Sequence, residues 1–496
     1  MVILGEDSQR MKDRDAQSHN IAAAQAVSES VRSTLGPKGM DKMLVSSMGD
    51  VTVTNDGVTI LQEMDIDNPT ASMVVEVAET QEDEAGDGTT TAVSIAGELL
   101  SNAEDMLEQD IHPTAIIRGF DLAAEQAREE IDEVSRTVDP DDTDLIRNVA
   151  ETSMTGKGAE LEKDVLAELV VDAVQAVTVD ADDGETVVDL EYVNVETQTG
   201  SAAGDSELLE GAVIDKDPAH AEMPTSLENA EVLLIDEPIE VEDTDADANL
   251  QLDSPDQLQN FLDKEEEQLR EKVETIAESG ADVVFCQKGI DDLAEHFLAQ
   301  EGVLAASRAK KSDLAFLREV VGAEVVSDLD ALAPGALGAA DVRFDDEEEL
   351  FYVEGTDEES HGVTLLLRGS TDHVVDELER GIGDALDVVA QCVSDGRVLA
   401  GGGAVEVEVA RRVREFADGV SGREQPFDAG VVESAHAKRQ ALSSATEAAN
   451  LVLKIDDIIA AGDLSTEGEE DAGGPGGAPG GGMGGMGGMG GMGGAM

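Results

Sequence analysis

The chain has 496 residues, more than one hydrophobic core normally fills, so we expect several domains. It carries 32 Lys and Arg against 111 Asp and Glu, and the resulting formal net charge of −79 argues against nucleic acid as the main partner. Because 41% of the residues are hydrophobic and apolar periodicity continues almost throughout, the acidity does not indicate a disordered chain.

The spread of acidic residues indicates adaptation to a salt-rich cytoplasm. At about 1 M salt the Debye length is about 3 Å, which screens the charge repulsion that would strain such a fold in dilute buffer. The N-terminus MVILGEDSQR holds only a three-residue apolar run, and no stretch approaches the roughly 18 apolar residues of a membrane span. We therefore expect a cytoplasmic protein without a signal peptide or a membrane partner.

Cysteine and histidine form no metal motif. Cys286 and Cys392 show neither ligand spacing nor a disulfide framework, which fits a reducing compartment. The seven histidines are scattered singly, without an HExxH pattern or a Cys/His cluster. Each histidine is therefore interpreted as a structural or surface residue.

The first predicted element is a helix over residues 21–35. Its apolar residues fall at spacings of three and four, which marks one face of a helix, and Gly36 and Pro37 end it. The segment that follows, LGPKGMDKMLV, carries a second glycine at Gly39, so its backbone could approach a ligand closely. A simple C-terminal helix turn explains the same pattern.

Two short strands are predicted next, at residues 43–45 and 51–54, around a turn at Gly49. Asn55-Asp56-Gly57 closes the second strand. Helices then continue from Pro69 through Pro113, a favourable first-turn proline, to about Ser153. Lys157 follows in the turn TGKG and is either an exposed turn lysine or a phosphate sensor.

Within this helical region lies GDGTTT, residues 86–91, which sets one aspartate between two glycines at the start of a helix. Backbone N–H groups at a helix N-terminus attract anions, threonine hydroxyls donate to phosphate oxygens, and a carboxylate can hold Mg²⁺. A capped helix start without any ligand accounts for the same residues, because Asp and Thr are common N-cap residues.

The middle of the chain changes character. Strands are predicted at residues 187–196, 211–215 and 231–235, and from Asp282 strands alternate with helices, which indicates a separate α/β domain with a parallel sheet. Residues 254–280 precede this alternation as a strongly acidic helix. Its apolar residues Leu258, Phe261 and Leu262 belong either to a core or to a partner-binding patch.

The last third returns to helices. A buried strand at 364–367 leads into a long helix from Thr371 to the turn Ser394-Asp395-Gly396, and the glycines 401–403 then open another helix. Helices are predicted onward to a low-complexity Gly/Met-rich tail, which needs no packed structure. No Walker A pattern occurs, so any ATP must be bound by a different cradle.

Together these segments resemble the archaeal group II chaperonins, the thermosomes, over nearly the whole chain, and the acidic composition is similar to that of halophilic archaea. The resemblance lies in LGPKGMDKMLV, VTVTNDGVTIL, GDGTTTAV, TSMTGKG, MPTSLENAEVLLIDEPIEV, SPDQLQNFLDKEE, ADVVFCQKGIDDLAEHFLA, VTLLLRGSTDHVVDELER, DGRVLAGGGAVEVE, SATEAANLVLKIDDIIAA and the GGM tail.

This resemblance implies a multidomain α and α/β chaperonin fold. A mostly helical equatorial domain would comprise residues 1–147 and 403–472, and an α/β intermediate domain 148–213 and 367–402. An α/β apical domain would comprise 214–366, with a helical protrusion at about 249–280 that serves as a built-in lid. Residues 473–496 would form a disordered tail.

The resemblance also assigns a nucleotide site. Asp87 would hold the Mg²⁺ of ATP, and the phosphates would be bound by Gly88, Thr89, Thr90 and Thr91. Lys157 would sense the γ-phosphate and Gly402 would lie against the nucleoside, while the turn lining the nucleotide would consist of Leu35, Gly36 and Pro37.

Two aspartates are the catalytic residues that the resemblance implies. Asp395 would orient or deprotonate the attacking water, and Asp56 would assist near the γ-phosphate. The implied cofactors are ATP and Mg²⁺, with K⁺ as a further candidate. The implied partners are unfolded or partly folded proteins and other subunits of a double ring, without a separate co-chaperonin.

One departure from the family pattern follows Gln425. The family continues there with several equatorial helices, one of which contacts the nucleoside, whereas residues 426–428 lead here almost directly to the closing segment. We therefore expect exposed apolar surface and a weakened adenine end. A diverged subunit with impaired ATPase, which binds unfolded protein or fills a mixed ring, is the second hypothesis.

Overall fold

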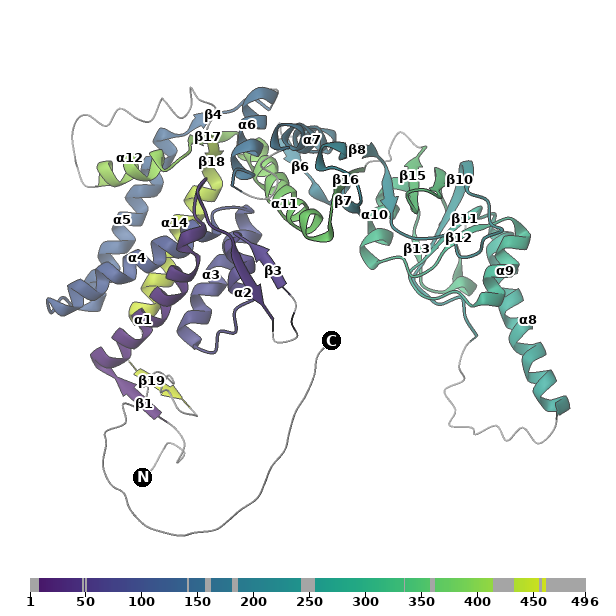
Figure 1. Cartoon of the computed structure of the whole chain (residues 1–496), viewed down its shortest axis with the longest axis horizontal. Helices are drawn as coiled ribbons and strands as arrows, with labels where there is room; N and C mark the ends of the chain where they lie inside the picture. Colours follow the sequence, from purple (N-terminus) through teal and green to yellow (C-terminus); the bar gives the residue numbers. More distant parts are fainter. Residues whose placement is uncertain are drawn as a thin grey trace, which may run out of the picture.

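The structure is a computed structural model, and it describes residues 9–46, 49, 51–140, 142–156, 162–180, 186–241, 255–333, 335–356, 362–413, 432–454 and 457–460. Its elements form a helical body, a smaller middle part and a larger α/β unit, which follow one another along the long axis (Figure 1). The helical body combines segments from both ends of the sequence, and the middle part combines segments that come before and after the larger unit in the sequence. Lys157, residues 421–431 and the tail 473–496 lie outside the described residues.

The helical body contains α1 (Asp13–Val31), η1 (Arg32–Thr34), α2 (Gly57–Gln62), α3 (Pro69–Ala85), α4 (Thr89–Glu108), α5 (Pro113–Val134), α12 (Ala404–Val413) and α14 (Ala435–Lys454). The predicted apolar face of α1 is confirmed, since Ile21, Ala24, Val27 and Val31 are at most 4% exposed. Leu35 is 50% exposed, because the chain leaves the helix through η1 before reaching it. The late helix α14 packs against α3, α4 and α5, so both ends of the chain share one core.

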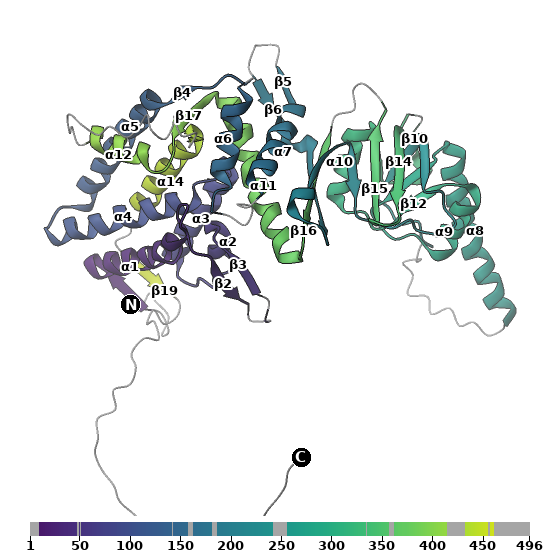
Figure 2. The same cartoon turned by 45° about the horizontal axis from the view of Figure 1, so that its top comes forward.

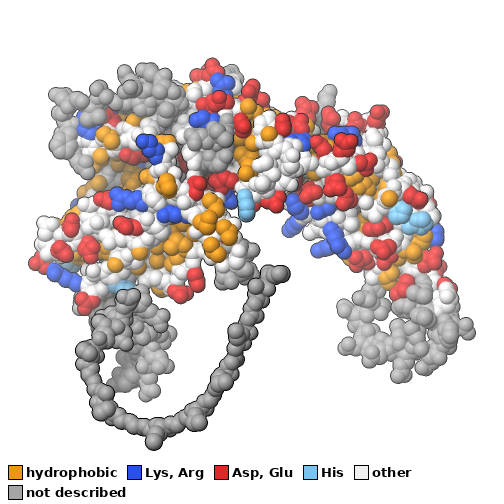
Figure 3. All heavy atoms as spheres, viewed as in Figure 1, with side chains coloured by type: hydrophobic (Ala, Val, Ile, Leu, Met, Phe, Trp, Pro, Cys, Tyr) orange, Lys and Arg blue, Asp and Glu red, His pale blue; other side chains and the backbone are white. Residues whose placement is uncertain are grey.

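Two small antiparallel pairs project from this body. The predicted hairpin is confirmed as β2 (Lys42–Val45) and β3 (Val51–Thr54), with Met43 opposite Val53. Its side chains Met43, Val45, Val51 and Val53 are exposed, and Figure 3 shows apolar side chains gathered at this edge of the body. The second pair joins β1 (Gln9–Lys12) to β19 (Asp457–Ala460), so the expectation of helix throughout the last segment is wrong here. Pairing with a distant strand decides the conformation.

A three-stranded sheet joins the helical body to the middle part, in the order β18 (Val432–Ser434), β17 (Arg397–Ala400) and β4 (Arg136–Thr137). The middle part contains α6 (Thr143–Ser153), α7 (Lys163–Ala176), β5 (Thr178–Asp180), β6 (Thr186–Val188), η2 (Leu190–Tyr192), β7 (Val193–Thr199), η3 (Ala203–Asp205), β8 (Glu207–Glu210), β16 (Val363–Gly369) and α11 (Asp372–Asp395).

Within the middle part β16 lies between β7, which is parallel to it, and β8, which is antiparallel. The single strand predicted over 187–196 is interrupted by η2, whose first turn is capped by the carboxylate of Asp189 at 3.0 Å from the N–H of Glu191. Helix α11 lies between this sheet and the helical body in both views (Figures 1 and 2). It therefore links the middle part to the body.

The larger unit contains β9 (Ala212–Ile214), β10 (Ser226–Ile235), α8 (Pro255–Ser279), β11 (Val283–Cys286), α9 (Asp292–Glu301), β12 (Leu304–Ala306), α10 (Lys311–Val321), β13 (Val325–Val326), η4 (Leu329–Ala331), β14 (Gly338–Asp345) and β15 (Leu350–Gly355). Its sheet runs in the order β12, β11, β10, β14, β15 and β9, and β13 also pairs with β10.

The predicted parallel strands with crossover helices are confirmed for β10, β11, β12 and β13. The sheet is nevertheless mixed, because β14, β15 and β9 join it antiparallel. The acidic helix predicted at 254–280 is α8, which extends away from the unit (Figure 2). The side chains of Leu258, Phe261 and Leu262 lie outside the described residues, so the choice between core and partner patch stays open.

Cys286 and Cys392 are buried free thiols, as expected from their spacing. Among the described residues, no helix is both long and apolar enough to cross a bilayer. Acidic side chains are scattered over the visible face from one end to the other (Figure 3). The charge is therefore distributed over all three parts and is not confined to one tail.

Candidate functional site

The centre of the candidate site is the turn between α3 and α4. Gly86 ends α3 with φ 59° and Gly88 precedes α4 with φ 87°, both left-handed values that glycine adopts readily, and Asp87 stands between them. The first helical bond of α4 runs from Ala92 N to Gly88 O, which leaves the N–H groups before it without helical acceptors. Gln81 is fully buried and donates from Nε2 to the Asp87 carbonyl at 2.7 Å, which fixes the turn.

The turn Asn55-Asp56-Gly57 lies directly against this helix start. A Cβ built on Gly57 would overlap Thr90 Oγ1 and lie 3.2 Å from Thr90 N, so a larger residue would require Thr90 to shift. Asp56 caps α2, since its Oδ2 accepts from Thr59 N at 2.8 Å. The structure thus brings the turn that carries Asp56 against Thr89 and Thr90 at the start of α4.

A third turn, at Leu35, Gly36 and Pro37, reaches the same region. Gly36 has φ +80° and open space where a Cβ would stand. Gly156 lies at the end of the turn after α6. A Cβ built on it would stand 3.4 Å from the carbonyl oxygen of Gly36. Asn55 donates from Nδ2 to the Gly156 carbonyl and, at 3.1 Å, to Asp41. Lys157 comes next in the chain, outside the described residues.

Asp395 lies on α11, the helix that contacts the end of α3. It is the last residue of α11 rather than part of the turn, and its Oδ2 accepts from Arg439 Nη2 of α14 at 2.6 Å. The helix touches the end of α3 earlier in its course, where Gln391 Nε2 donates to the Glu84 carbonyl at 2.7 Å and Asp387 lies against Gly86. Asp395 stands two turns beyond Asp387, about 12 Å along the helix axis. No contact among the described residues joins Asp395 to Asp87.

Gly402 lies in the turn between β17 and α12. Its φ of +68° is left-handed, and a Cβ built on it meets no atom within 4 Å. The backbone is therefore open on this side. Among the described residues, none of the other predicted site residues lies within 4 Å of a Cβ built on Gly402.

Between this turn and α4 runs an apolar groove of about 480 Å³. Thr91 of α4 is one of its lining residues, and the apolar lining includes Leu99, Phe120, Ala124, Val405 and Leu442. On its wall Lys438 donates to Glu406 Oε1 at 2.7 Å. Burial acts to raise the pKa of Glu406, but the Lys438 ammonium outweighs it and the pKa lies below its usual range. The groove lies beside Thr91, one of the predicted phosphate-binding residues, and the expectation of exposed apolar surface stays a prediction.

This arrangement fits a phosphate chain with a divalent cation. Unpaired N–H groups and threonine hydroxyls converge at the start of α4. Within the described part of the chain no hydrogen bond or ion pair holds the Asp87 carboxylate, which is half-buried next to them. Carboxylate and phosphate oxygens are the ligands that Mg²⁺ prefers. The residues present therefore suit Mg²⁺ at Asp87.

Several residues around the site escaped the sequence reasoning. Gln81 holds the turn at Asp87, and Asn55 holds the turn at Gly156. The sequence pattern identified both turns but gave these two residues no role. Their position close to a glycine turn in the sequence is the signal that could have found them. Arg439 pairs with Asp395 across 44 residues, and nothing in the sequence connects the two. His220 and His296 also come together, although they are 76 positions apart.

Comparison with known proteins gives the family. A sequence model of the TCP-1/cpn60 chaperonin family matches residues 27–427. The chain is 65% identical to thermosome subunit 2 of Haloferax volcanii, over 96% of this chain and 95% of the relative. It is 63% identical to thermosome subunit beta of Halobacterium salinarum, over 94% of each. It is 50% identical to a thermosome subunit of Methanopyrus kandleri, over 94% of this chain and 95% of the relative.

The alignment with the first of these relatives also shows that a segment of the relative is missing from this chain. The alignment with the Haloferax volcanii protein runs for 528 positions, whereas 96% of the 496 residues of this chain is about 476 residues. About 50 aligned positions of that relative therefore have no counterpart in this chain. The shortfall has the size of the several helices that the family pattern leads one to expect after Gln425.

Proposed function

Because the chain belongs to the TCP-1/cpn60 chaperonin family, we propose that it is a subunit of an ATP-driven group II chaperonin. Such a subunit assembles into a double ring, encloses non-native protein and promotes its folding. The observation that carries the proposal is a chain of contacts between turns: Gly57 lies against Thr90 at the start of α4, Asn55 donates to the Gly156 carbonyl, and Gly156 lies against Gly36. The identity to halophilic thermosome subunits over nearly the whole chain supports it.

In this proposal the helical body is the equatorial domain (1–147 and 403–472), the middle part the intermediate domain (148–213 and 367–402), and the larger α/β unit the apical domain (214–366). The separate buried cores of the three parts support this division. Helix α8 would carry the built-in lid. The exposed apolar hairpin β2–β3 and the β1–β19 pair are the surfaces that we assign to contacts between neighbouring subunits.

The chemistry follows from the residues of the site. Asp87 would hold Mg²⁺, which neutralises phosphate charge when bound. Gly88 and Thr89 to Thr91 would bind phosphate oxygens through N–H groups and hydroxyls, and Asp56 would stand near the γ-phosphate. Asp395 would orient or deprotonate the attacking water. Lys157 would sense the γ-phosphate, and the turns at Leu35 to Pro37 and at Gly402 would border the nucleoside.

We infer a way in which hydrolysis would be gated from the ion pair of Asp395. In the present arrangement Arg439 occupies its carboxylate. For Asp395 to reach a water at the phosphates, the end of α11 must move down toward α4, which carries the middle part with it. ATP would favour this closed state because only there do its phosphates meet the catalytic carboxylate. Product loss would restore the pair.

A second candidate function rests on the groove beside Thr91 and on the roughly 50 missing aligned positions. If the missing helices are those that cover this groove, the adenine end of the site lacks a wall. The chain would then be a diverged subunit with weak ATPase that binds unfolded protein or completes a mixed ring.

Hydrolysis of Mg-ATP by the purified chain in molar KCl separates the two functions. We expect turnover that disappears in Asp395→Ala, together with elution as a ring in size-exclusion chromatography. Equal background rates in both proteins, with a ring still formed, would support the second function. A monomer without turnover that never binds unfolded protein would contradict both.

A further inference from the structure

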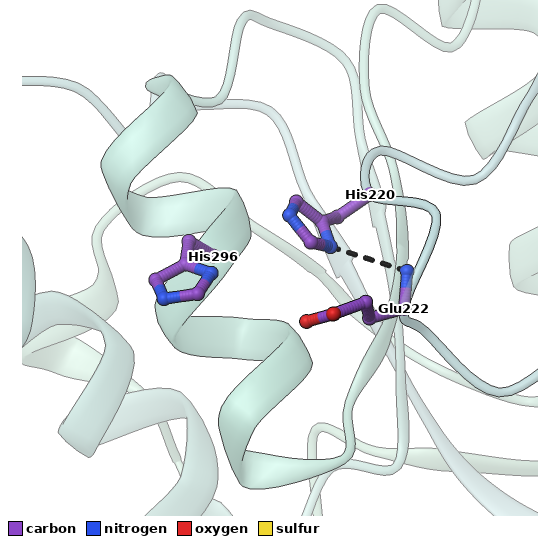
Figure 4. Close-up of side chains that lie close together, drawn as sticks. All are labelled: His220, Glu222 and His296. Atoms are coloured by element: carbon purple, nitrogen blue, oxygen red, sulfur yellow. Dashed lines mark hydrogen bonds between the residues drawn. The ribbon is translucent and has the colours of Figure 1, made fainter.

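The larger α/β unit carries a cluster of potential metal ligands far from the turns at α4. His220 and Glu222 lie in the loop between β9 and β10, and His296 lies on α9. One ligand atom of each side chain lies within 4.8 Å of the other two. Figure 4 shows the Glu222 side chain extending from the loop toward α9, next to the two imidazole rings. We propose that these three residues form a divalent transition-metal site, with Zn²⁺ as the fitting ion.

The hydrogen-bond partner of His296 is Gln300, one helical turn further along α9. The two Nε2 atoms are 2.7 Å apart, and in this arrangement the amide N–H donates to an unprotonated His296 Nε2. With the amide turned over, its oxygen instead accepts from a protonated Nε2, and metal binding at Nδ1 requires this second arrangement. The lone pair then stands on Nδ1, which is free to bind an ion. A hydrogen bond on the outer nitrogen is the usual support of a metal-bound imidazole.

His220 has a longer hydrogen bond than His296. Its Nδ1 accepts from the backbone N–H of Glu222 at 3.2 Å, at the long end of the normal range. In that tautomer the proton sits on Nε2, so metal binding at Nε2 requires the proton to move to Nδ1 and this bond to open. The ring centroids of His220 and His296 are 5.5 Å apart, so neither ring shields the other from an ion between them.

The ligand set selects the metal. Two imidazole nitrogens and one carboxylate oxygen, with a fourth position for water, suit Zn²⁺ or Co²⁺ in tetrahedral geometry, whereas Mg²⁺ and Ca²⁺ prefer oxygen alone. Ligand atoms around such an ion are about 3.4 Å apart at bond lengths near 2.1 Å. The ligand atoms must therefore approach one another by up to about 1.4 Å, and the exposed Glu222 and its loop are placed to do so.

An ion there would connect the loop before β10 to α9. The loop is already tied to the sheet, since Ala219 N donates to Ala305 O at 2.7 Å and Ala305 N donates to the sulfur of Met223 at 3.3 Å. On the other side α9 supports α8, where the Arg270 guanidinium stacks 4.2 Å from the ring centroid of Phe297. The metal would therefore clamp the base of the extended helix to the sheet.

Metal titration of the full chain in molar KCl tests the site. Zn²⁺ is measured by competition with a chromophoric chelator, and Co²⁺ by the visible absorption of a tetrahedral complex. We expect one equivalent bound at micromolar affinity, a loss of at least tenfold in His220→Gln and in His296→Gln, and about tenfold in Gln300→Leu. Circular dichroism in the same buffer verifies that each variant is folded.

The matched control is His373→Gln, which removes an exposed histidine of α11 and should leave affinity and stoichiometry unchanged. Mg²⁺ at the same concentration should not displace Zn²⁺. Hydrogen exchange should slow in residues 215–225 and in α9 on adding Zn²⁺, in the wild type only. Undiminished binding by the folded His220→Gln/His296→Gln double variant, or an octahedral Co²⁺ spectrum, would overturn the proposal in favour of adventitious binding by surface carboxylates.

Discussion

Arg439 of α14 donates to the carboxylate of Asp395, the last residue of α11, at 2.6 Å. The two side chains are 24% and 31% exposed, and Arg439 also donates to Asp132 of α5 at 2.6 Å. One guanidinium thus fixes the end of the helix that leads into the middle part. A partly exposed pair of this kind contributes about 0–1 kcal/mol, so opening it requires little free energy.

Arg439→Gln should raise ATP turnover a few-fold in molar KCl, because Asp395 no longer has to leave a cationic partner. Asp395→Asn should lower turnover at least a hundredfold while nucleotide binding is kept. Steady-state hydrolysis with calorimetric ATP binding measures both. Arg128→Gln is the matched control, since it removes a different exposed arginine that donates to Ser443 of α14. A loss of turnover in Arg439→Gln would show that the pair positions Asp395 for the reaction instead of restraining it.

Gly57→Ala should weaken Mg-ATP binding by at least tenfold without unfolding the chain. The new methyl group would overlap Thr90 Oγ1 and force the Asp56 turn away from the start of α4. Gly119→Ala is the control, because that exposed glycine of α5 has open space around its Cβ and the change favours helix by up to about 1 kcal/mol. Isothermal calorimetry with thermal unfolding separates the two effects. Equal ATP affinity in the two variants would argue against a shared pocket.

The adenine moiety should add little to binding if the groove beside Thr91 lacks its cover. We expect ATP to bind no more than about tenfold tighter than inorganic triphosphate, both with Mg²⁺, since only the phosphate end is built from closely packed turns. Competition calorimetry in molar KCl measures the ratio. The intact Haloferax volcanii relative is the reference protein, and a similar ratio in both chains would contradict the prediction.

Glu196 should make the fold less stable as the pH rises. Burial raises its pKa to about 7, the Lys310 ammonium at 3.8 Å offsets part of this rise, and Asp313 and Asp215 add to it. The folded state therefore holds a proton that the unfolded state releases near pH 4.5, and the resulting penalty grows between pH 4.5 and 7. Glu196→Gln should add about 2 kcal/mol to the free energy of unfolding at pH 8 and little at pH 4.5. Denaturant unfolding at both values gives the difference, and an equal effect at both would refute the assignment.

The chain should lose its structure on transfer from molar to millimolar KCl. Its net charge of −79 is distributed over the surface, and at 0.1 M salt the Debye length has already grown to about 10 Å, so that carboxylates repel over several residues. Far-ultraviolet circular dichroism during dialysis follows the change, with refolding on returning KCl. An unchanged spectrum in millimolar KCl would count against adaptation to salt.

Local sequence determined most of the elements and turns. The spacing of Ile21, Ala24, Val27 and Val31 gave the buried face of α1, and the glycines around Asp87 gave a left-handed turn, because both depend on residues close together in the chain. The parallel strands of the larger unit followed from alternation of strand and helix patterns. The antiparallel half of that sheet and the β1–β19 pair did not, because their hydrogen bonds join segments that no local pattern relates.

For GDGTTT the sequence alone left two readings, a capped helix or a phosphate site, and both rest on the same few residues. The tertiary structure added the neighbours, since Gly57 against Thr90 and Gly156 against Gly36 join turns that are far apart in the chain. The Arg439–Asp395 pair and the His220, Glu222 and His296 cluster were also decided by tertiary structure alone. Charge pairing and metal ligation act through space over a few ångströms, whereas sequence patterns report periodicity along one element.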